Sequence, residues 1–202
     1  MNRYYLRSSK FKLDNSDDES EENSDEIKVI NNDIYFYCDV NAKTCLKLIE
    51  ILKRLEIESL CIGIKFNIKS PNIVLHINSD GGEINSALAV VDTIRNSRVN
   101  INSIVEGTAC SAATLISISC HNRQITQNSH MLIHQLSCEG FWGKMTEIED
   151  EMKNLKRTMK VIKKLYNDFT KIDCQELPNI LKKDLLWSSK KCLKLGLVDE
   201  II

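Results

Sequence analysis

An almost continuously apolar segment, residues 72–78, is the feature that most constrains the fold of this chain. Its sequence, Asn-Ile-Val-Leu-His-Ile-Asn, leads directly into a turn that contains Gly81 and Gly82. Strands of this kind are typical of parallel sheets in which helices cover both faces. A helical pattern over residues 85–95 follows, so the segment predicts a strand, a turn and a crossover helix.

The alternation of strands and helices continues along the chain. We predict further strands over residues 33–37, 101–105, 123–126 and 131–135. We predict helices after Asp39 as N-cap and over residues 112–120 and 179–183, with a last helix between Ser188 as N-cap and Gly196. Residues 58–66 have an ambiguous pattern that fits a helix end followed by a loop. This pattern predicts one α/β domain with a mainly parallel sheet over residues 30–202.

A long amphipathic stripe begins after Lys144. Apolar side chains recur there at alternating steps of three and four residues, at Met145, Ile148, Met152, Leu155, Met159, Ile162, Tyr166 and Phe169. Such spacing predicts one long helix with a narrow apolar face. Charged residues fill the opposite face, so we expect this helix to associate with a second copy rather than only with its own core.

The charge distribution is strongly uneven. Residues 14–26 contain eight acidic residues and no basic one, although the whole chain has a net charge of only −1. The remaining 20 acidic and 27 basic residues give +7. Such an acidic block is typical of a solvated arm, so we predict that residues 1–29 form a disordered N-terminal arm. A docking or self-masking role is the alternative for this segment.

Composition also limits the classes of function. No apolar run of 18 residues suggests a membrane span, and no basic stripe with interleaved aromatic residues suggests nucleic-acid binding. The eight cysteines form no C-x-x-C pair, so we expect reduced thiols and no metal site. These features favour a cytoplasmic protein, while an organellar location stays open.

Ser111 is the candidate nucleophile. It lies in the sequence Gly107-Thr108-Ala109-Cys110-Ser111, between an apolar strand and an apolar helix. Free backbone N–H groups at a helix N-terminus stabilise a developing negative charge, as acyl transfer requires. The alternative is that Ser111 only caps the helix.

Acyl transfer to a serine also needs a base and an acidic residue that orients it. Of the four histidines, His134 is the best candidate because it ends an apolar strand, where its ring can face a cleft. For the orienting acid, Asp184 ranks before Asp173 and Asp199, because it lies between apolar segments and is expected to be partly buried. Spacing alone does not assemble these three residues.

Five ordered motifs resemble the proteolytic subunit of the ATP-dependent Clp protease. They are Ser79-Asp80-Gly81-Gly82, Gly107-Thr108-Ala109-Cys110-Ser111, Met131-Leu132-Ile133-His134-Gln135, Asp184-Leu185-Leu186-Trp187-Ser188 and Gly196-Leu197-Val198-Asp199. The resemblance covers about residues 30–202. It implies a crotonase-like ββα superhelix with a long projecting handle helix.

The resemblance also implies a set of functional residues and partners. Ser111 would be the nucleophile, His134 the base and Asp184 the orienting acid, while the backbone N–H groups of Gly82 and Ala112 would bind the oxyanion. It implies cleavage of polypeptides inside stacked heptameric rings that the handle helices join, with a separate AAA+ unfoldase as partner. The subunit has no phosphate-binding loop, so we expect no bound ATP and no other cofactor.

The chain departs from the family pattern at several positions. Asp80 replaces a proline beside the expected oxyanion site, Ala112 a methionine, Cys110 an alanine and Leu136 a proline. Cys110 could therefore make activity sensitive to thiol reagents. The acidic N-terminus does not resemble the axial segment of the family.

Two alternatives for the function remain. One is a non-catalytic subunit of a mixed ring, which Asp80 slightly favours. The other is a crotonase-type enzyme acting on acyl-CoA, which would not need the Ser111, His134 and Asp184 set.

Overall fold

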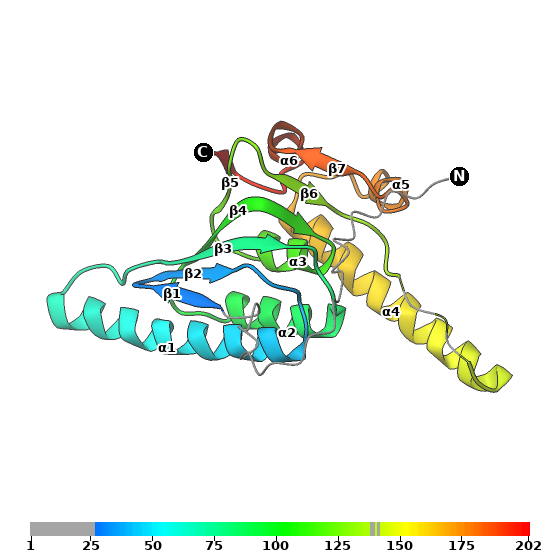
Figure 1. The fold of residues 1–202 in the computed structure, drawn as a ribbon, viewed down its shortest axis with the longest axis horizontal. Helices are drawn as coiled ribbons and strands as arrows, with labels where there is room; N and C mark the ends of the chain where they lie inside the picture. Colours follow the sequence, from blue (N-terminus) through cyan, green and yellow to red (C-terminus); the bar gives the residue numbers. More distant parts are fainter. Residues whose placement is uncertain (1–26, 138–139, 141) are drawn as a thin grey trace, which may run out of the picture.

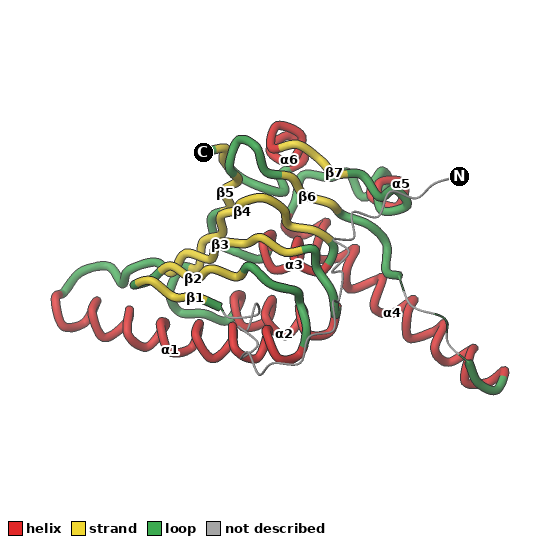
Figure 2. Tube along the Cα trace, viewed as in Figure 1, coloured by secondary structure: helices red, strands yellow, loops and turns green. Residues whose placement is uncertain are grey.

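A computed structural model describes residues 27–137, 140 and 142–202. A sheet forms the centre of the fold, with helices packed below it and at one end (Figure 1). Its strands are β1 (Lys28–Ile30), β2 (Asp33–Phe36), β3 (Ile73–Ser79), β4 (Ile101–Cys110), β5 (Arg123–Ile125), β6 (His130–Leu132), β7 (Leu186–Ser188) and β8 (Glu200–Ile201). The main order is β1-β2-β3-β4-β5-β8, and β6 pairs with both β4 and β7 (Figure 2).

The sheet is mainly parallel, which confirms the predicted α/β class. The pairs β2–β3, β3–β4, β4–β5, β4–β6 and β5–β8 are parallel, whereas β1–β2 and β6–β7 are antiparallel. The long strand β4 pairs with β5 along its middle part and with β6 at its carboxyl end. Its residues 103–105 pair with β5 and its residues 108–110 pair with β6. The chain therefore bends away from one layer of strands into another just before Ser111.

Six helices complete the described part of the fold. They are α1 (Ala42–Phe66), α2 (Ile84–Arg95), α3 (Ala112–Ile118), α4 (Met145–Phe169), α5 (Leu177–Ile180) and α6 (Ser189–Leu195). The helices α1 and α2 pack against each other along one side of the sheet (Figure 1). Across the described ranges, no helix combines the length and the apolar character that crossing a membrane requires.

Strand β3 is not buried on both faces, so that prediction was wrong. Ile73, Leu75 and Ile77 are fully buried, but Val74 and His76 between them remain partly accessible. Helices cover only the face that carries Ile73, Leu75 and Ile77. The polar side chain of His76 lies on the opposite face. The alternation was difficult to read because Val74 has the same apolar character as its buried neighbours.

The first helix begins later and ends later than the sequence indicated. Asn41, not Asp39, is its N-cap: the Asn41 side chain accepts the Thr44 N–H at 2.9 Å, and the Thr44 hydroxyl accepts the Asn41 N–H at 3.1 Å. The helix then includes the whole ambiguous segment and ends at Asn67, whose φ of 49° is left-handed. It therefore extends beyond the sheet that it covers (Figure 1).

Strand β1 at the start of the domain and strands β7 and β8 near its end were not predicted from the sequence. Strand β1 begins at Lys28, and Ile27 before it is buried, so residues 27–29 belong to the fold rather than to the expected arm. Residues 1–26 of that arm lie outside the described residues.

The short helix expected over residues 179–183 is α5, over Leu177–Ile180. Ser188 and Gly196 flank α6 as expected.

The predicted long helix is α4, which projects away from the sheet (Figure 1). Its apolar stripe has two different environments. Ile162 and Tyr166 are buried in the core of their own chain, whereas the side chains of Met145 and Met152 are 70% and 45% exposed. Only the first half of the stripe is therefore available for a partner.

Candidate active site

The sharp turn at Ser111 joins the end of β4 to the start of α3. Its dihedral angles, φ 53° and ψ −123°, are rare for a residue other than glycine, and such backbone strain costs about 1–3 kcal/mol. The Ser111 N–H donates to the carbonyl of Leu132 at 2.8 Å, which ties the turn to β6. The serine side chain makes no capping hydrogen bond. The structure therefore does not support the capping alternative, because the hydroxyl is directed elsewhere.

Buried hydrogen bonds from Thr114 also stabilise the Ser111 turn. The Thr114 hydroxyl donates to the Ser111 carbonyl at 2.6 Å, and it lies 2.5 Å from the hydroxyl of Tyr166. Both Thr114 and Tyr166 are almost completely buried, and burial raises the pKa of the Tyr166 hydroxyl well above its usual range. The sequence analysis missed this link. Thr114 follows Ser111 by three residues, which is a common spacing for such side-chain bonds, but nothing in the sequence identified Tyr166 as its partner.

His134 lies next to the Ser111 hydroxyl. Its Nε2 atom is 2.7 Å from Ser111 Oγ. The topology explains this contact: β6 pairs in parallel with the end of β4, so the residue shortly after β6 lies beside the residue that follows β4. The side chain of His134 is 22% exposed, which leaves the ring accessible from the cleft.

Asp184 lies on the far side of the His134 ring. Its Oδ1 atom is 3.2 Å from His134 Nδ1, and β7, which follows Asp184, pairs with β6. The Gln135 N–H also donates to the Leu181 carbonyl at 2.6 Å, which holds the two segments together. The Asp184 side chain is 78% exposed, so the prediction that it is partly buried was wrong. Its field at His134 is therefore weakened by water.

The other acidic candidates have structural roles elsewhere. Asp173 accepts the N–H of Gln175 within a turn. Asp199 forms an ion pair with Arg123 at 2.5 Å, and this guanidinium lowers the pKa of the Asp199 carboxyl. Of the three candidates, the structure therefore brings only Asp184 to His134.

The remaining histidines are also placed away from Ser111. His76 lies between Glu106 at 3.0 Å and Asp33 at 3.6 Å, and it stacks on Tyr35. His121 contacts the backbone of Ile101, and His130 is part of β6. His134 is thus the only histidine of the four that contacts the candidate nucleophile.

The glycine turn after β3 packs against the Ser111 turn. A Cβ atom on Gly81 would lie 2.8 Å from the Ser111 Cβ, and one on Gly82 would lie 2.1 Å from the Val40 carbonyl oxygen. Val40 donates its N–H to the Gly81 carbonyl at 2.8 Å and accepts the Glu83 N–H at 2.7 Å. Because Gly81 and Glu83 both bond to Val40, the Gly82 N–H between them faces the opposite side, as in a parallel ladder.

A small hollow of about 50 Å³ opens in front of these groups. Gly82, Ser111, Ala112 and His134 line its polar side. As the first residue of α3, Ala112 has an N–H without an acceptor in its own helix. Ile84, Leu115, Ile162 and Tyr166 make the apolar remainder of the wall. The hollow thus has the components that acyl transfer needs: a hydroxyl, an imidazole and N–H groups near one position.

The structure describes no metal site and no reactive thiol at this position. Among the described residues, no three His, Cys, Asp or Glu side chains are grouped so that they could hold a metal ion. Cys110 is buried, and burial, together with the nearby Asp80 carboxylate, raises its pKa to about 11. A thiol that stays protonated is a poor nucleophile, which argues against the proposed sensitivity to thiol reagents.

Comparison with known proteins gives the same family as the motifs. The sequence pattern of the Clp protease family matches residues 21–202. The chain is 29% identical over 132 residues to the ATP-dependent Clp protease proteolytic subunit of Deinococcus radiodurans, which covers 64% of each protein. It is 25% identical over 132 residues to proteolytic subunit 1 of Corynebacterium glutamicum, again with 64% of each covered.

A third relative is proteolytic subunit 1 of the ATP-dependent Clp protease of Thermobifida fusca. The identity is 27% over 133 residues, which cover 65% of this chain and 60% of the relative. The chain thus spans about two thirds or less of the length of the relatives it matches. The family match, however, extends over nearly the whole domain. This chain therefore belongs to the Clp protease family.

Proposed function

We propose that this chain is a serine-type endopeptidase that cleaves unfolded polypeptides through an acyl-enzyme intermediate. The observation that carries the proposal is the continuous contact from Ser111 Oγ to His134 Nε2, at 2.7 Å, and from His134 Nδ1 to Asp184, at 3.2 Å. This arrangement has the order of groups that nucleophilic catalysis by serine requires. The relatives named as Clp protease proteolytic subunits support the same activity.

In the proposed reaction, the Ser111 hydroxyl attacks the carbonyl carbon of the substrate peptide bond and transfers its proton to His134 Nε2. The negative charge moves to the carbonyl oxygen, where the N–H groups of Gly82 and Ala112 stabilise it. His134 then gives the proton to the leaving amine, and the C–N bond breaks. A water molecule, deprotonated by His134, hydrolyses the remaining Ser111 ester. Asp184 accepts the Nδ1–H of His134 and holds the ring in the required tautomer.

Assembly into a chamber is the second part of the proposal. Met145 and Met152 expose large apolar side chains near the start of α4, on a helix that projects from its own domain. A second copy that packs against this half of the helix would bury them. We propose stacked heptameric rings joined in this way, in line with the family. A separate AAA+ unfoldase would supply extended polypeptides to the chamber.

The test is hydrolysis by the purified full-length chain. We expect cleavage of a short fluorogenic peptide and of an unfolded protein, and a loss of about 10³-fold or more for Ser111→Ala and His134→Ala. Ser70→Ala is the matched control because Ser70 lies shortly before β3, at the amino ends of the parallel strands, whereas Ser111 follows the carboxyl end of β4. A correctly folded, assembled chain without activity would instead support a non-catalytic ring subunit. Acyl-CoA hydrolysis independent of Ser111 would support the crotonase-type alternative.

A further inference from the structure

The carbonyl group of Ser111 lies on the buried side of the nucleophile turn. It accepts two hydrogen bonds from one residue: the Thr114 N–H donates at 3.0 Å and the Thr114 hydroxyl donates at 2.6 Å. Thr114 is fully buried, so water does not compete for either bond. The direction of the Ser111 carbonyl is therefore set from within the core.

The hydroxyl groups of Thr114 and Tyr166 donate in a defined order. A threonine hydroxyl has a single hydrogen, and a carbonyl oxygen cannot donate, so the Thr114 hydrogen lies on the bond to Ser111. The 2.5 Å contact between the two hydroxyls must then use the hydrogen of Tyr166. Burial raises the pKa of the Tyr166 hydroxyl well above its usual range, so this donor keeps its proton. The bonds form a chain from Tyr166 through Thr114 to the Ser111 carbonyl.

The peptide unit that contains the Ser111 carbonyl also contains the Ala112 N–H, one of the two proposed oxyanion donors. The described residues contain no cis peptide bond, so the N–H of this unit points away from its carbonyl. Because the carbonyl is held toward Thr114, the N–H faces the opposite side. Gly82, Ser111 and Ala112 line the hollow on that side. Thr114 therefore controls the direction of a donor that lies outside its own hydrogen bonds.

The strained backbone of Ser111 explains why this control is needed. Its φ of 53° and ψ of −123° are rare for a residue other than glycine. Rotation about the Ser111 ψ angle would relieve the strain, and it would also turn the Ala112 N–H out of the hollow. The two bonds from Thr114 oppose this rotation, because the rotation would move the carbonyl away from both donors.

Hydrogen bonds to a peptide carbonyl also change the N–H of the same peptide unit. The unit is conjugated, so a bond donated to its oxygen draws electron density from its nitrogen and leaves the N–H more positive. Successive buried hydrogen bonds strengthen one another by about 10–30% per bond. The chain that begins at Tyr166 thus makes the Ala112 N–H a better donor to a developing oxyanion.

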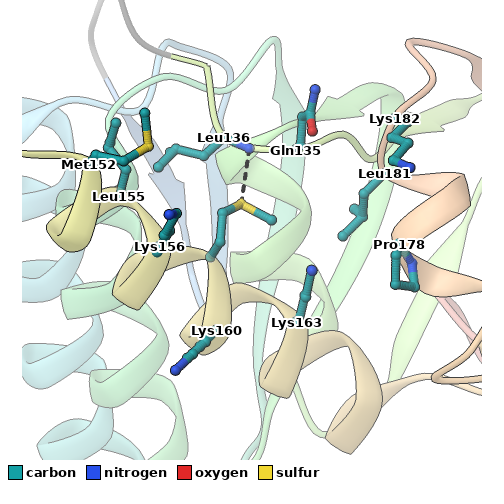
Figure 3. A pocket seen from close by; sticks show the side chains of 11 residues that line it. Gln135, Leu136, Met152, Leu155, Lys156, Lys160, Lys163, Pro178, Leu181 and Lys182 are labelled. Atoms are coloured by element: carbon teal, nitrogen blue, oxygen red, sulfur yellow. Dashed lines mark hydrogen bonds between the residues drawn. The ribbon is translucent and has the colours of Figure 1, made fainter. Parts of the chain in front are cut away.

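Tyr166 lies on α4, which also supports another wall of the hollow. The Leu136 N–H donates to the sulfur of Met159 at 3.1 Å, about two turns before Tyr166 on the same helix (Figure 3). Leu136 lines both the hollow and a larger groove of about 520 Å³ between α4 and the region of α5 (Figure 3). This wall belongs to the segment that follows His134 and contains neither oxyanion donor. Met159 is therefore a contact of the same helix that should not affect the oxyanion site.

We propose that Thr114 and Tyr166 are positioning residues for the oxyanion site, because their hydrogen-bonded chain aims the Ala112 N–H into the hollow and strengthens it as a donor. The proposal rests on the proposed peptidase function, since it assigns these residues a part in stabilising its transition state. The chain takes effect when negative charge develops on the substrate oxygen, so its loss should lower kcat and leave KM nearly unchanged. The Gly82 N–H remains as a second donor, so the loss should be partial.

Thr114→Val tests the proposal because it replaces the hydroxyl by a methyl group of similar size. We expect kcat for a short fluorogenic peptide to fall about 10-fold, less than the roughly 10²- to 10³-fold for removal of a whole oxyanion donor, with KM within about 2-fold. A peptide boronate forms a tetrahedral adduct with an oxygen at the oxyanion position, so its affinity should fall by the same factor as kcat. Thr114→Ser, which keeps the hydroxyl, should retain the wild-type values.

Removal of both hydroxyls separates this role from a purely structural one. Thr114→Val leaves the Tyr166 hydroxyl buried without its acceptor, so the melting temperature should fall. In Thr114→Val/Tyr166→Phe neither hydroxyl is present, so the melting temperature should recover while kcat stays about 10-fold low. A purely structural contact would instead restore kcat and the melting temperature together.

Two control variants address general effects of the substitutions. Thr93→Val removes a hydroxyl that donates to the Ala89 carbonyl at 2.9 Å within α2, away from the hollow. Met159→Leu changes the other α4 contact with little change in volume, so its kcat and boronate affinity should stay within about 2-fold of wild type. Both controls should keep the wild-type ratio of kcat to boronate affinity.

The possible outcomes distinguish failure of this proposal from failure of the peptidase function. A folded wild-type chain that neither hydrolyses the peptide nor binds the boronate would contradict the peptidase function and, with it, the role of Thr114. An active wild-type chain whose folded Thr114→Val variant keeps its kcat and boronate affinity would overturn the present proposal alone. If Thr114→Val does not fold, the double variant decides together with Tyr166→Phe, which should lower kcat and boronate affinity by the same few-fold factor; unchanged values in both would overturn the proposal.

Discussion

Asp184→Asn tests how much an exposed carboxylate contributes to this candidate site. The Oδ1 atom lies 3.2 Å from His134 Nδ1, but the side chain is 78% exposed. At 3.2 Å, two unit charges interact by about 5 kcal/mol at an effective dielectric constant of 20 and by about 1.3 kcal/mol in water. The high exposure places the interaction of Asp184 with protonated His134 near the lower value. We therefore expect the variant to lose about 10- to 100-fold in kcat/KM.

This expectation differs from that for a buried orienting acid. Where the aspartate is enclosed, the same substitution lowers the rate by about 10⁴-fold, because the amide also favours the wrong tautomer. The assay is hydrolysis of a short fluorogenic peptide at pH 7 and at two salt concentrations. Asp173→Asn is the matched control, since its carboxylate accepts a backbone N–H in a turn away from His134.

Two results would refute this reasoning about Asp184. A loss of 10⁴-fold or more would show that the carboxylate acts in a shielded environment that its exposure does not indicate. Full activity of the variant would show that Asp184 does not orient His134. The predicted loss should also decrease at high salt, because exposed charges are screened.

Three further predictions concern the stability of the fold and the position of the Ser111 turn. Asp199→Asn should lower the free energy of unfolding by about 1 kcal/mol at pH 7, because it removes the carboxylate partner of Arg123 but that carboxylate is 40% exposed and screened by water. Arg123 lowers the pKa of Asp199, so the wild-type advantage in urea unfolding should be present above about pH 4 and disappear as the pH falls below the folded-state pKa. Gly81→Ala, with a Cβ 2.6 Å from the Cys110 carbonyl oxygen and a φ of 96°, should cost at least about 1–3 kcal/mol in thermal unfolding and abolish hydrolysis. Tyr166→Phe removes the 2.5 Å contact to Thr114, so stability should fall by about 1 kcal/mol and kcat by a few-fold; unchanged kcat would show that this network does not position the turn.

Much of the fold was visible in the sequence because its central elements have strong local patterns. The strand before Gly81 and the strand before Ser111 are apolar and end in turns, and α4 has an uninterrupted stripe. The missed elements β1, β7 and β8 contain only two or three residues each, and hydrogen bonds to distant segments define them. In these three segments the sequence has no periodic pattern long enough to indicate a strand.

The candidate site could be predicted only in part. Ser111 and His134 end strands that are neighbours in the sheet, so topology brings them together. Asp184 ranked first among the acids because it lies between apolar segments, and the family resemblance implied the same role. Its exposure was not foreseen because the flanking leucines suggested burial. The contact between Thr114 and Tyr166 joins residues 52 positions apart, and a tyrosine within an apolar stripe gives no sign of a hydrogen-bonding role.

The most direct test of the central claim is covalent labelling of the nucleophile. A serine-directed fluorophosphonate, applied to the full-length chain and followed by intact mass and peptide mapping, should add one label at Ser111. Labelling should disappear in Ser111→Ala and become much slower in His134→Ala, because Nε2 lies 2.7 Å from the hydroxyl that it would deprotonate. Persistent labelling of the Ser111→Ala chain, or a folded wild-type chain that takes no label, would contradict the assignment of Ser111 as the nucleophile.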